Sequence, residues 1–211
     1  MLANPPLALI GHAEAVTDEY TPGEKTQKAW SNAGDEWDSF GAMDVPTTWG
    51  HTLRLNSLDY YTELRETMLA KLDALAPGLR EKIRQRKLED DLTPEERVAW
   101  ENERPEEELS GSEAAARANA QRKLNVSSAE VAEEVPEDKR ALARSYAMQA
   151  GEAGVMAQRI SAYRMQVNYD YWITRSRVEA NDTTAAARRY MRQAGNEADA
   201  LNPEGARELF E

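Results

Sequence analysis

The stretch LARSYAMQAGEAGVMAQRISAYRMQV, residues 142–167, decides the fold of this chain. Only Gln149 interrupts its apolar face, whose residues alternate at intervals of four and three positions: Leu142, Tyr146, Ala153, Met156, Ile160, Tyr163 and Val167. Such spacing is typical of a helix that packs along another helix, as in a coiled coil. It predicts one long central helix over about 136–180, which would measure roughly 65 Å at 1.5 Å per residue.

A second apolar face follows a cap at Asn56 or Ser57 and runs through Leu58, Tyr61, Leu64, Met68, Leu72 and Leu75. We expect this helix, residues 57–76, to pack antiparallel to part of 136–180. Pro77 and Gly78 then interrupt it, and another helix is predicted over 79–88. No stretch alternates convincingly as a strand does. The sequence therefore predicts an all-α protein, an elongated helical hairpin or bundle.

An aromatic-rich helix is predicted near the start of the chain, within a helical region over 21–88. TPGEK, residues 21–25, offers Thr21 as a cap, Pro22 at the first helical position and Glu24 to complete a capping box. An apolar stripe follows, and Gly41 is placed to end the helix: Trp30, Ala33, Trp37, Phe40. Residues 1–20 read as an irregular segment, and 41–56 as an ordered loop that buries Trp49.

The acidic charge of the chain is concentrated in its middle. The net charge is −12. Residues 89–138 carry 16 acids and 5 bases, whereas residues 139–211 carry 9 acids and 11 bases. Nucleic-acid binding needs clustered Lys and Arg, so this balance argues against it. The one basic run, REKIRQRK at 80–87, is followed at once by EDD and indicates a self-neutralising helix face.

The acidic segment over 89–135 contains few large apolar residues. Thr93, Pro94 and Glu96 form a capping-box pattern at its start. Beyond that pattern, short exposed helices and partial disorder are both compatible with this composition. Of the two, we favour a mobile excursion from the helical body.

The C-terminal residues 183–211 predict a partial helical-repeat pair after a turn at Asn181 and Asp182. They resemble part of a tetratricopeptide repeat through Tyr190, Ala194, Gly195, Ala198, Pro203, Ala206 and Phe210. A helical repeat hides its second face against the next repeat. We therefore expect an exposed interaction face at Tyr190, Met191 and Phe210. The alternative is that the last turn folds back and seals against Trp172.

No residue pattern indicates catalysis, a cofactor or a metal site. The chain has no Cys, and its two histidines, His12 and His51, lie in no metal-binding motif. Gly-Glu-Ala-Gly at 151–154 lies inside the predicted helix and follows no strand, so it is no nucleotide loop. PPLALIG, residues 5–11, is too short to span a bilayer and follows no basic residue. We expect no membrane segment and no signal peptide in this chain, and leave its compartment open.

The aromatic stretch NYDYW, residues 168–172, raises a choice between packing and ligand stacking. A ligand site would need an open cleft with polar groups, and Arg175 is the only candidate nearby. We favour an aromatic packing cluster formed by Trp30, Trp37, Trp49, Tyr169 and Trp172. The alternative is an enzyme or ligand-binding protein with a site around Trp30, Trp37, Trp49 and Trp172.

Three stretches together resemble a family of planctomycete proteins that carry the label "IRE (iron responsive element)". They are KAWSNAGDEWDSFGAMDVPTTWG at 28–50, LDALAPGLREKIR at 72–84 and VNYDYWITRSRVEA at 167–180. The resemblance covers roughly residues 20–211. Members of that family are longer, with an N-terminal membrane anchor and further helical repeats; we expect no such anchor within these 211 residues. The label implies no iron chemistry, and the family supplies no catalytic residues.

We therefore expect a non-catalytic helical scaffold or protein-interaction module, as a portion of a longer repeat protein. Its partner would be another protein or a second copy of the chain. Nucleic-acid binding through 80–87 is the weakest of the functions considered.

Overall fold

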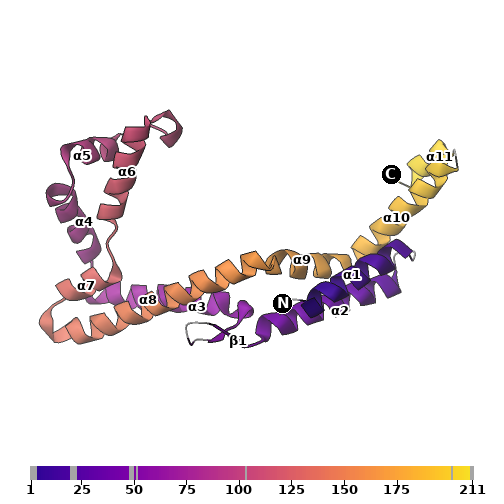
Figure 1. The fold of residues 1–211 in the computed structure, drawn as a ribbon, viewed down its shortest axis with the longest axis horizontal. Coiled ribbons are helices and arrows are strands. Elements are labelled where there is room, and N and C mark those ends of the chain that lie inside the picture. Colours follow the sequence, from indigo (N-terminus) through magenta and orange to yellow (C-terminus); the bar gives the residue numbers. More distant parts are fainter. Residues whose placement is uncertain are drawn as a thin grey trace. The chain divides into compact units, whose positions relative to one another are not determined.

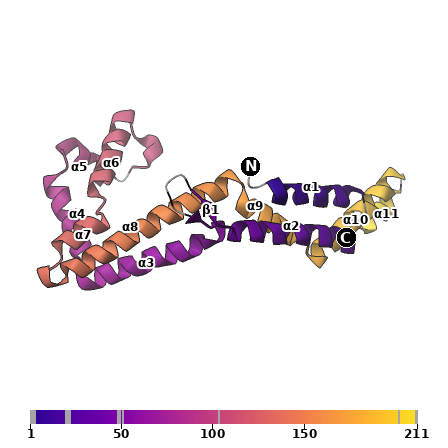
Figure 2. The same cartoon turned by 60° about the horizontal axis from the view of Figure 1, so that its bottom comes forward.

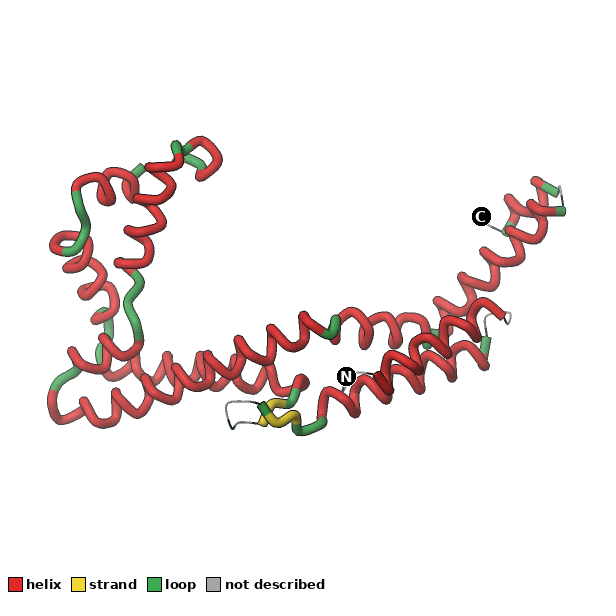
Figure 3. Tube along the Cα trace, in the orientation of Figure 1, coloured by secondary structure: helices red, strands yellow, loops and turns green. Residues whose placement is uncertain are grey.

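The chain is all-α, with one very short strand pair among the described residues (Figure 3). The computed structural model describes residues 4–19, 23–47, 50, 52–102, 104–200 and 202–209. Its α-helices are α1 Asn4–Glu19, α2 Glu24–Ala42, α3 Leu58–Leu75, α4 Leu79–Asp90, α5 Pro94–Glu101, α6 Gly111–Leu124, α7 Ser128–Glu134, α8 Glu137–Gln166, α9 Tyr169–Glu179, α10 Asp182–Asp199 and α11 Pro203–Glu208. Two 3-10 turns, η1 Leu55–Ser57 and η2 Glu106–Glu108, complete the helical elements.

These helices form two compact units. The aromatic unit comprises the described residues up to Asp59 and from Gln158 onward, and the middle unit comprises Tyr60–Ala157. These units differ from the sequential division into 21–88, 89–135 and 136–180, which stays a prediction. Helix α8 contributes residues to both units, because it is long enough to pack in each of them.

Helix α1 replaces the predicted irregular segment at 1–20. Its Ile10 and Ala13 are buried with Trp30 and Ala33 of α2 in one core cluster. Pro5 and Pro6 lie in the first turn, where the backbone N–H groups have no helical acceptor, so both are tolerated. Helix α1 therefore gains its stability from packing on α2, which lies beside it in Figures 1 and 2.

Helix α2 begins later and ends later than predicted. Its N-cap is Gly23, and the Thr26 hydroxyl accepts a hydrogen bond of 2.8 Å from the Gly23 N–H. The predicted cap, Thr21 with Pro22, lies outside the described residues. The helix also continues past Gly41 to Ala42.

The loop after α2 contains the strand pair. Strands β1 Val45–Pro46 and β2 Thr52–Leu53 pair antiparallel, with Val45 opposite Leu53. No pattern in the sequence predicts this pair, which leaves the all-α class unchanged. Two-residue strands are too short to show the alternation on which the prediction of strands rests.

The predicted single helix over 136–180 is wrong, because Val167 and Asn168 separate α8 from α9. Asn168 has a φ of 52°, in the left-handed region that asparagine adopts more easily than most residues. Arg164 of α8 pairs with Asp170 of α9 and donates a 3.0 Å hydrogen bond to the Leu55 carbonyl. These contacts hold the backbone on both sides of the break.

Within the middle unit, α3 and α8 run antiparallel, side by side (Figures 1 and 2). Leu72 of α3 is buried with Ala143 and Ala147 of α8, while Arg65 lies 3.3 Å from a side chain built at Gly154. The buried positions on this part of α8 are alanines. Leu142, predicted to lie on the packed apolar face, is exposed instead. The contact between the two helices is therefore made by larger side chains of α3 that reach small residues of α8.

Residues 89–135 form helices α5, α6 and α7 around buried residues of their own. Leu92, Ala120 and Leu124 make one cluster, and Val131, Ala132 and Val135 join Leu72 and Ile83 in another. Of the two expectations for this segment, short helices are what the structure contains. Helix α5 starts with the predicted capping box, in which the Thr93 hydroxyl accepts from the Glu96 N–H.

Candidate functional site

The aromatic cluster lies at the centre of the aromatic unit. Trp30 and Trp37 of α2 and Tyr169 of α9 are buried there, with relative exposures of 2%, 0% and 3%. Trp37 meets Tyr169 edge-on, with ring centroids 6.0 Å apart, and Trp172 is half-buried against the same cluster. Trp49, the fifth predicted member, lies outside the described residues.

Two glycines of α2 allow α9 to approach closely. A Cβ built at Gly41 would lie 2.0 Å from the Tyr169 hydroxyl oxygen, whereas one at Gly34 would meet Ser176 at an ordinary 3.4 Å. Gly41 thus provides space for a tyrosine ring and does not end the helix. Burial raises the pKa of the Tyr169 hydroxyl, which therefore stays protonated at neutral pH.

The polar groups around this cluster are engaged in packing. The Arg175 guanidinium lies 5.0 Å from the centre of the Trp30 ring and 5.6 Å from that of Trp172, and it pairs with Glu14 of α1 at 2.8 Å. The Trp30 indole N–H donates to the Thr17 hydroxyl at 2.9 Å. Tyr171 is exposed and packs edge-on against Trp172. Among the described residues, these contacts join the rings to α1 and to one another.

No cluster suited to a metal ion occurs in the part of the chain that the structure describes. His12 is exposed on α1, and His51 lies outside the described residues. No described helix is both long and apolar enough to cross a membrane.

Helix α10 is the second region singled out by the sequence, and polar contacts attach it to α1, α2 and α9 of the same unit. Arg188 pairs with Glu179 of α9. Arg192 donates to the Asp18 carbonyl of α1 at 2.8 Å. Gln27 of α2 donates to Asp182 at 2.6 Å. Ala185 is buried beside these contacts.

The apolar side of α10 lies on the opposite face. Tyr190 and Met191 are 55% and 60% exposed. At 100° per residue they share a face with further small residues, all exposed: Thr183, Ala187, Gly195 and Ala198. Ala194 of this face is buried, and Ala206 is buried on α11, the helix that packs on α10. Phe210 lies outside the described residues.

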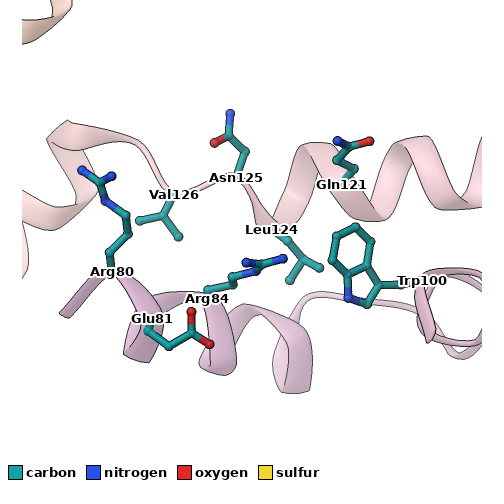
Figure 4. A pocket seen from close by; sticks show the side chains of 8 residues that line it. All are labelled: Arg80, Glu81, Arg84, Trp100, Gln121, Leu124, Asn125 and Val126. Atoms are coloured by element: carbon teal, nitrogen blue, oxygen red, sulfur yellow. The ribbon is translucent and has the colours of Figure 1, made fainter. Parts of the chain in front are cut away.

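The basic run 80–87 occupies α4, where acids from α3 and α7 pair with several of its members. Arg80 pairs with Asp73, Arg86 with Glu134 and Lys87 with Glu130. Arg84 instead lies over the Trp100 ring, 5.4 Å from its centre, at the edge of an open hollow (Figure 4). Sequence reasoning missed this hollow, because Trp100 and Arg84 come from different helices that nothing in the sequence pairs.

Comparisons with protein-family models, curated proteins and solved structures find no match to this chain.

Proposed function

We propose that this chain is a non-catalytic helical interaction module that associates with a second copy of itself through the exposed face of α10. The observation that supports the proposal is the orientation of this helix. Arg188 and Arg192 contact α9 and α1, while Tyr190 and Met191 are exposed to solvent. An amphipathic helix normally buries its apolar side, so this orientation leaves the apolar side for another polypeptide.

We take a second copy of the chain as the occupant, because one exposed apolar face can serve both sides of a symmetric contact. Two α10 helices placed antiparallel about a two-fold axis would set Tyr190 and Met191 of each copy against those of the other, in a contact that closes on itself.

The likeness of α10 and α11 to part of a tetratricopeptide repeat supports the same proposal. In repeat proteins each helix pair covers the exposed face of its neighbour. Here the second copy would take the place of that neighbour. The resemblance to planctomycete proteins that contain further helical repeats supports the same proposal.

The alternative, a ligand site around Trp30, Trp37, Trp49 and Trp172, receives no support from the described residues. Trp30 and Trp37 are buried, and Arg175 is engaged with Glu14 and two indole rings.

Sedimentation equilibrium tests the proposal. The unmodified chain should dimerise as its concentration rises, and Tyr190→Glu with Met191→Glu should weaken that dimer at least tenfold, because two charges would be desolvated in the contact. Met148→Glu with Val155→Glu is the matched control, since both residues are exposed on α8. A chain that stays monomeric, or a dimer equally weakened by the control pair, would refute the proposal.

A further inference from the structure

The hollow beside Arg84 has the size and the lining of a small ligand site. It is independent of the association proposed for α10. It measures about 320 Å³ and lies within the middle unit, between α4, the end of α5, the end of α6 and the residues that follow it. That volume is at the lower end of the range for small-molecule sites, roughly 300–1,000 Å³. Its walls are Arg80, Glu81, Arg84, Trp100, Gln121, Leu124, Asn125 and Val126.

Arg84 differs from the bases of α4 that form ion pairs. Arg86 and Lys87 form close ion pairs with the glutamates of α7. No described residue accepts a hydrogen bond from the Arg84 guanidinium, which lies over the face of the Trp100 ring. Stacking on an indole leaves the N–H groups at the edge of a guanidinium available for a ligand.

Arg80, one turn before Arg84, adds a second guanidinium. It reaches Asp73 only at 3.4 Å, and its Nε is buried without a hydrogen-bond acceptor. A buried donor without an acceptor costs stability, so an acceptor brought by a ligand would be favourable there.

The remaining walls combine an apolar floor with neutral polar groups. Figure 4 shows Leu124 between the tip of Arg84 and the Trp100 ring, with Gln121 and Asn125 in the upper part of the view. Glu81 is the one acid in the lining, and its carboxylate lies on the far side of Arg84 from those two amides (Figure 4). The part of the hollow between Arg84 and the amides is therefore positive or neutral.

We propose that this hollow binds a small molecule that carries a carboxylate or phosphate group on a planar, apolar body. A planar guanidinium binds both oxyanions through two parallel hydrogen bonds, and Trp100 and Leu124 provide apolar surface for the body. Cations are disfavoured by the two arginines. Nucleic acid is disfavoured by the ion pairs of Arg86 and Lys87 and by the excess of acids in 89–138.

Titrations with benzoate and phenyl phosphate, followed by NMR of the Trp100 indole N–H and by calorimetry, test the proposal. At least one of the two should bind saturably, and the tighter one identifies the oxyanion. Benzamide, the neutral analogue of benzoate, should bind at least tenfold more weakly. Failure of both anions to saturate, or equal binding of benzamide, would overturn the proposal.

Two substitutions at one position separate geometry from charge. Arg84→Gln should raise the Kd at least tenfold, and Arg84→Lys, which keeps the charge but loses the planar fork, should raise it nearly as much. Arg86→Gln is the matched control on the same helix and should change the Kd less than twofold. If Arg86→Gln weakens binding as much as Arg84→Gln, the anion responds only to diffuse charge and the site is refuted. Far-UV circular dichroism verifies that each variant remains folded.

Discussion

The two units are stabilised by different means. In the aromatic unit, large rings from α2 and α9 pack into one core, and Trp30, Trp37, Phe40 and Tyr169 are all buried. The middle unit has two small clusters made mostly of aliphatic residues and alanines. Since the free energy lost on truncation grows with the buried side chain, substitutions in the aromatic core should have the larger effects.

In the middle unit, several helices begin with a capping box whose glutamate also forms an ion pair. Glu96, Glu113 and Glu130 each complete a capping box at the start of a helix. Each of these carboxylates also pairs with a base elsewhere in the unit: Lys123, Arg104 and Lys87 respectively. Local hydrogen bonds and ion pairs therefore contribute more to this unit, and the stability of such contacts depends on pH.

The largest effect is expected for Trp37→Ala. Removing a fully buried indole should lower the free energy of unfolding by about 3–5 kcal/mol. Hydrogen exchange should show a loss of amide protection in the aromatic unit. The protection of α5 and α6 in the middle unit should change little. Equal loss of protection in both units would mean that they unfold as one and would break the comparison.

Gly41→Ala should lower the free energy of unfolding by about 2–3 kcal/mol, because the new Cβ would overlap the buried ring of Tyr169. Gly34→Ala, on the same helix and facing the same partner, should change it by well under 1 kcal/mol, since its Cβ would make only an ordinary contact with Ser176. Urea unfolding of both variants measures the difference. Similar costs for the two would show that α2 and α9 do not approach closely at Gly41.

Acid should destabilise the middle unit before the aromatic unit. The Ser110 cap, with Arg104, lowers the pKa of Glu113 to about 2, and Lys87, with the Ser127 cap, lowers that of Glu130 to about 2, from an ordinary 4.5. Between these values the unfolded chain binds more protons, so this stability is complete above pH 4.5 and is lost as the pH falls toward 2.

Glu130 should contribute about 1 kcal/mol to this effect, once solvent screening is allowed for. Replacement of Glu130 with Gln should therefore flatten the pH dependence of unfolding below pH 4.5. Glu152→Gln serves as a control in the same unit, because Glu152 is exposed in the interior of α8 and takes part in no cap. An unchanged acid profile in Glu130→Gln would contradict the assignment.

The smallest effect is expected for Gly151→Ala. This glycine is exposed in the interior of α8, and a Cβ there would meet nothing within 4 Å. Alanine should therefore raise the free energy of unfolding by about 0.5–1 kcal/mol through its higher helix propensity. Thermal unfolding measures the gain. A loss of stability would indicate that a neighbouring helix lies closer to Gly151 than the structure places it.

The sequence predicts local features more successfully than long-range ones. The all-α class, the interruption at Pro77 and Gly78, and the capping box at Thr93 all follow from short patterns, and each is confirmed. The Gly78 φ of 74° is the left-handed conformation that glycine favours at such an interruption.

Features that depend on tertiary contact escaped prediction. The packing of Ile10 and Ala13 on α2 stabilises α1, although the sequence pattern within 1–20 does not predict a helix of this length. The predicted helix over 136–180 also runs through Asn168 without a break, yet the left-handed backbone at Asn168 separates α8 from α9. The hollow at Arg84 depends on Trp100 reaching it from α5, an encounter that helix periodicity cannot reveal.

Concentration-dependent hydrogen exchange across α10 tests the central claim most directly, namely that its apolar face is covered by a second copy. If α10 pairs with itself, amide protection over 183–199 should rise as the chain is concentrated through its dimerisation range. Protection over α5 and α6 should stay constant, and Tyr190→Glu with Met191→Glu should abolish the rise. Protection of α10 that is independent of concentration, in a chain that sediments as a monomer throughout, would contradict the account.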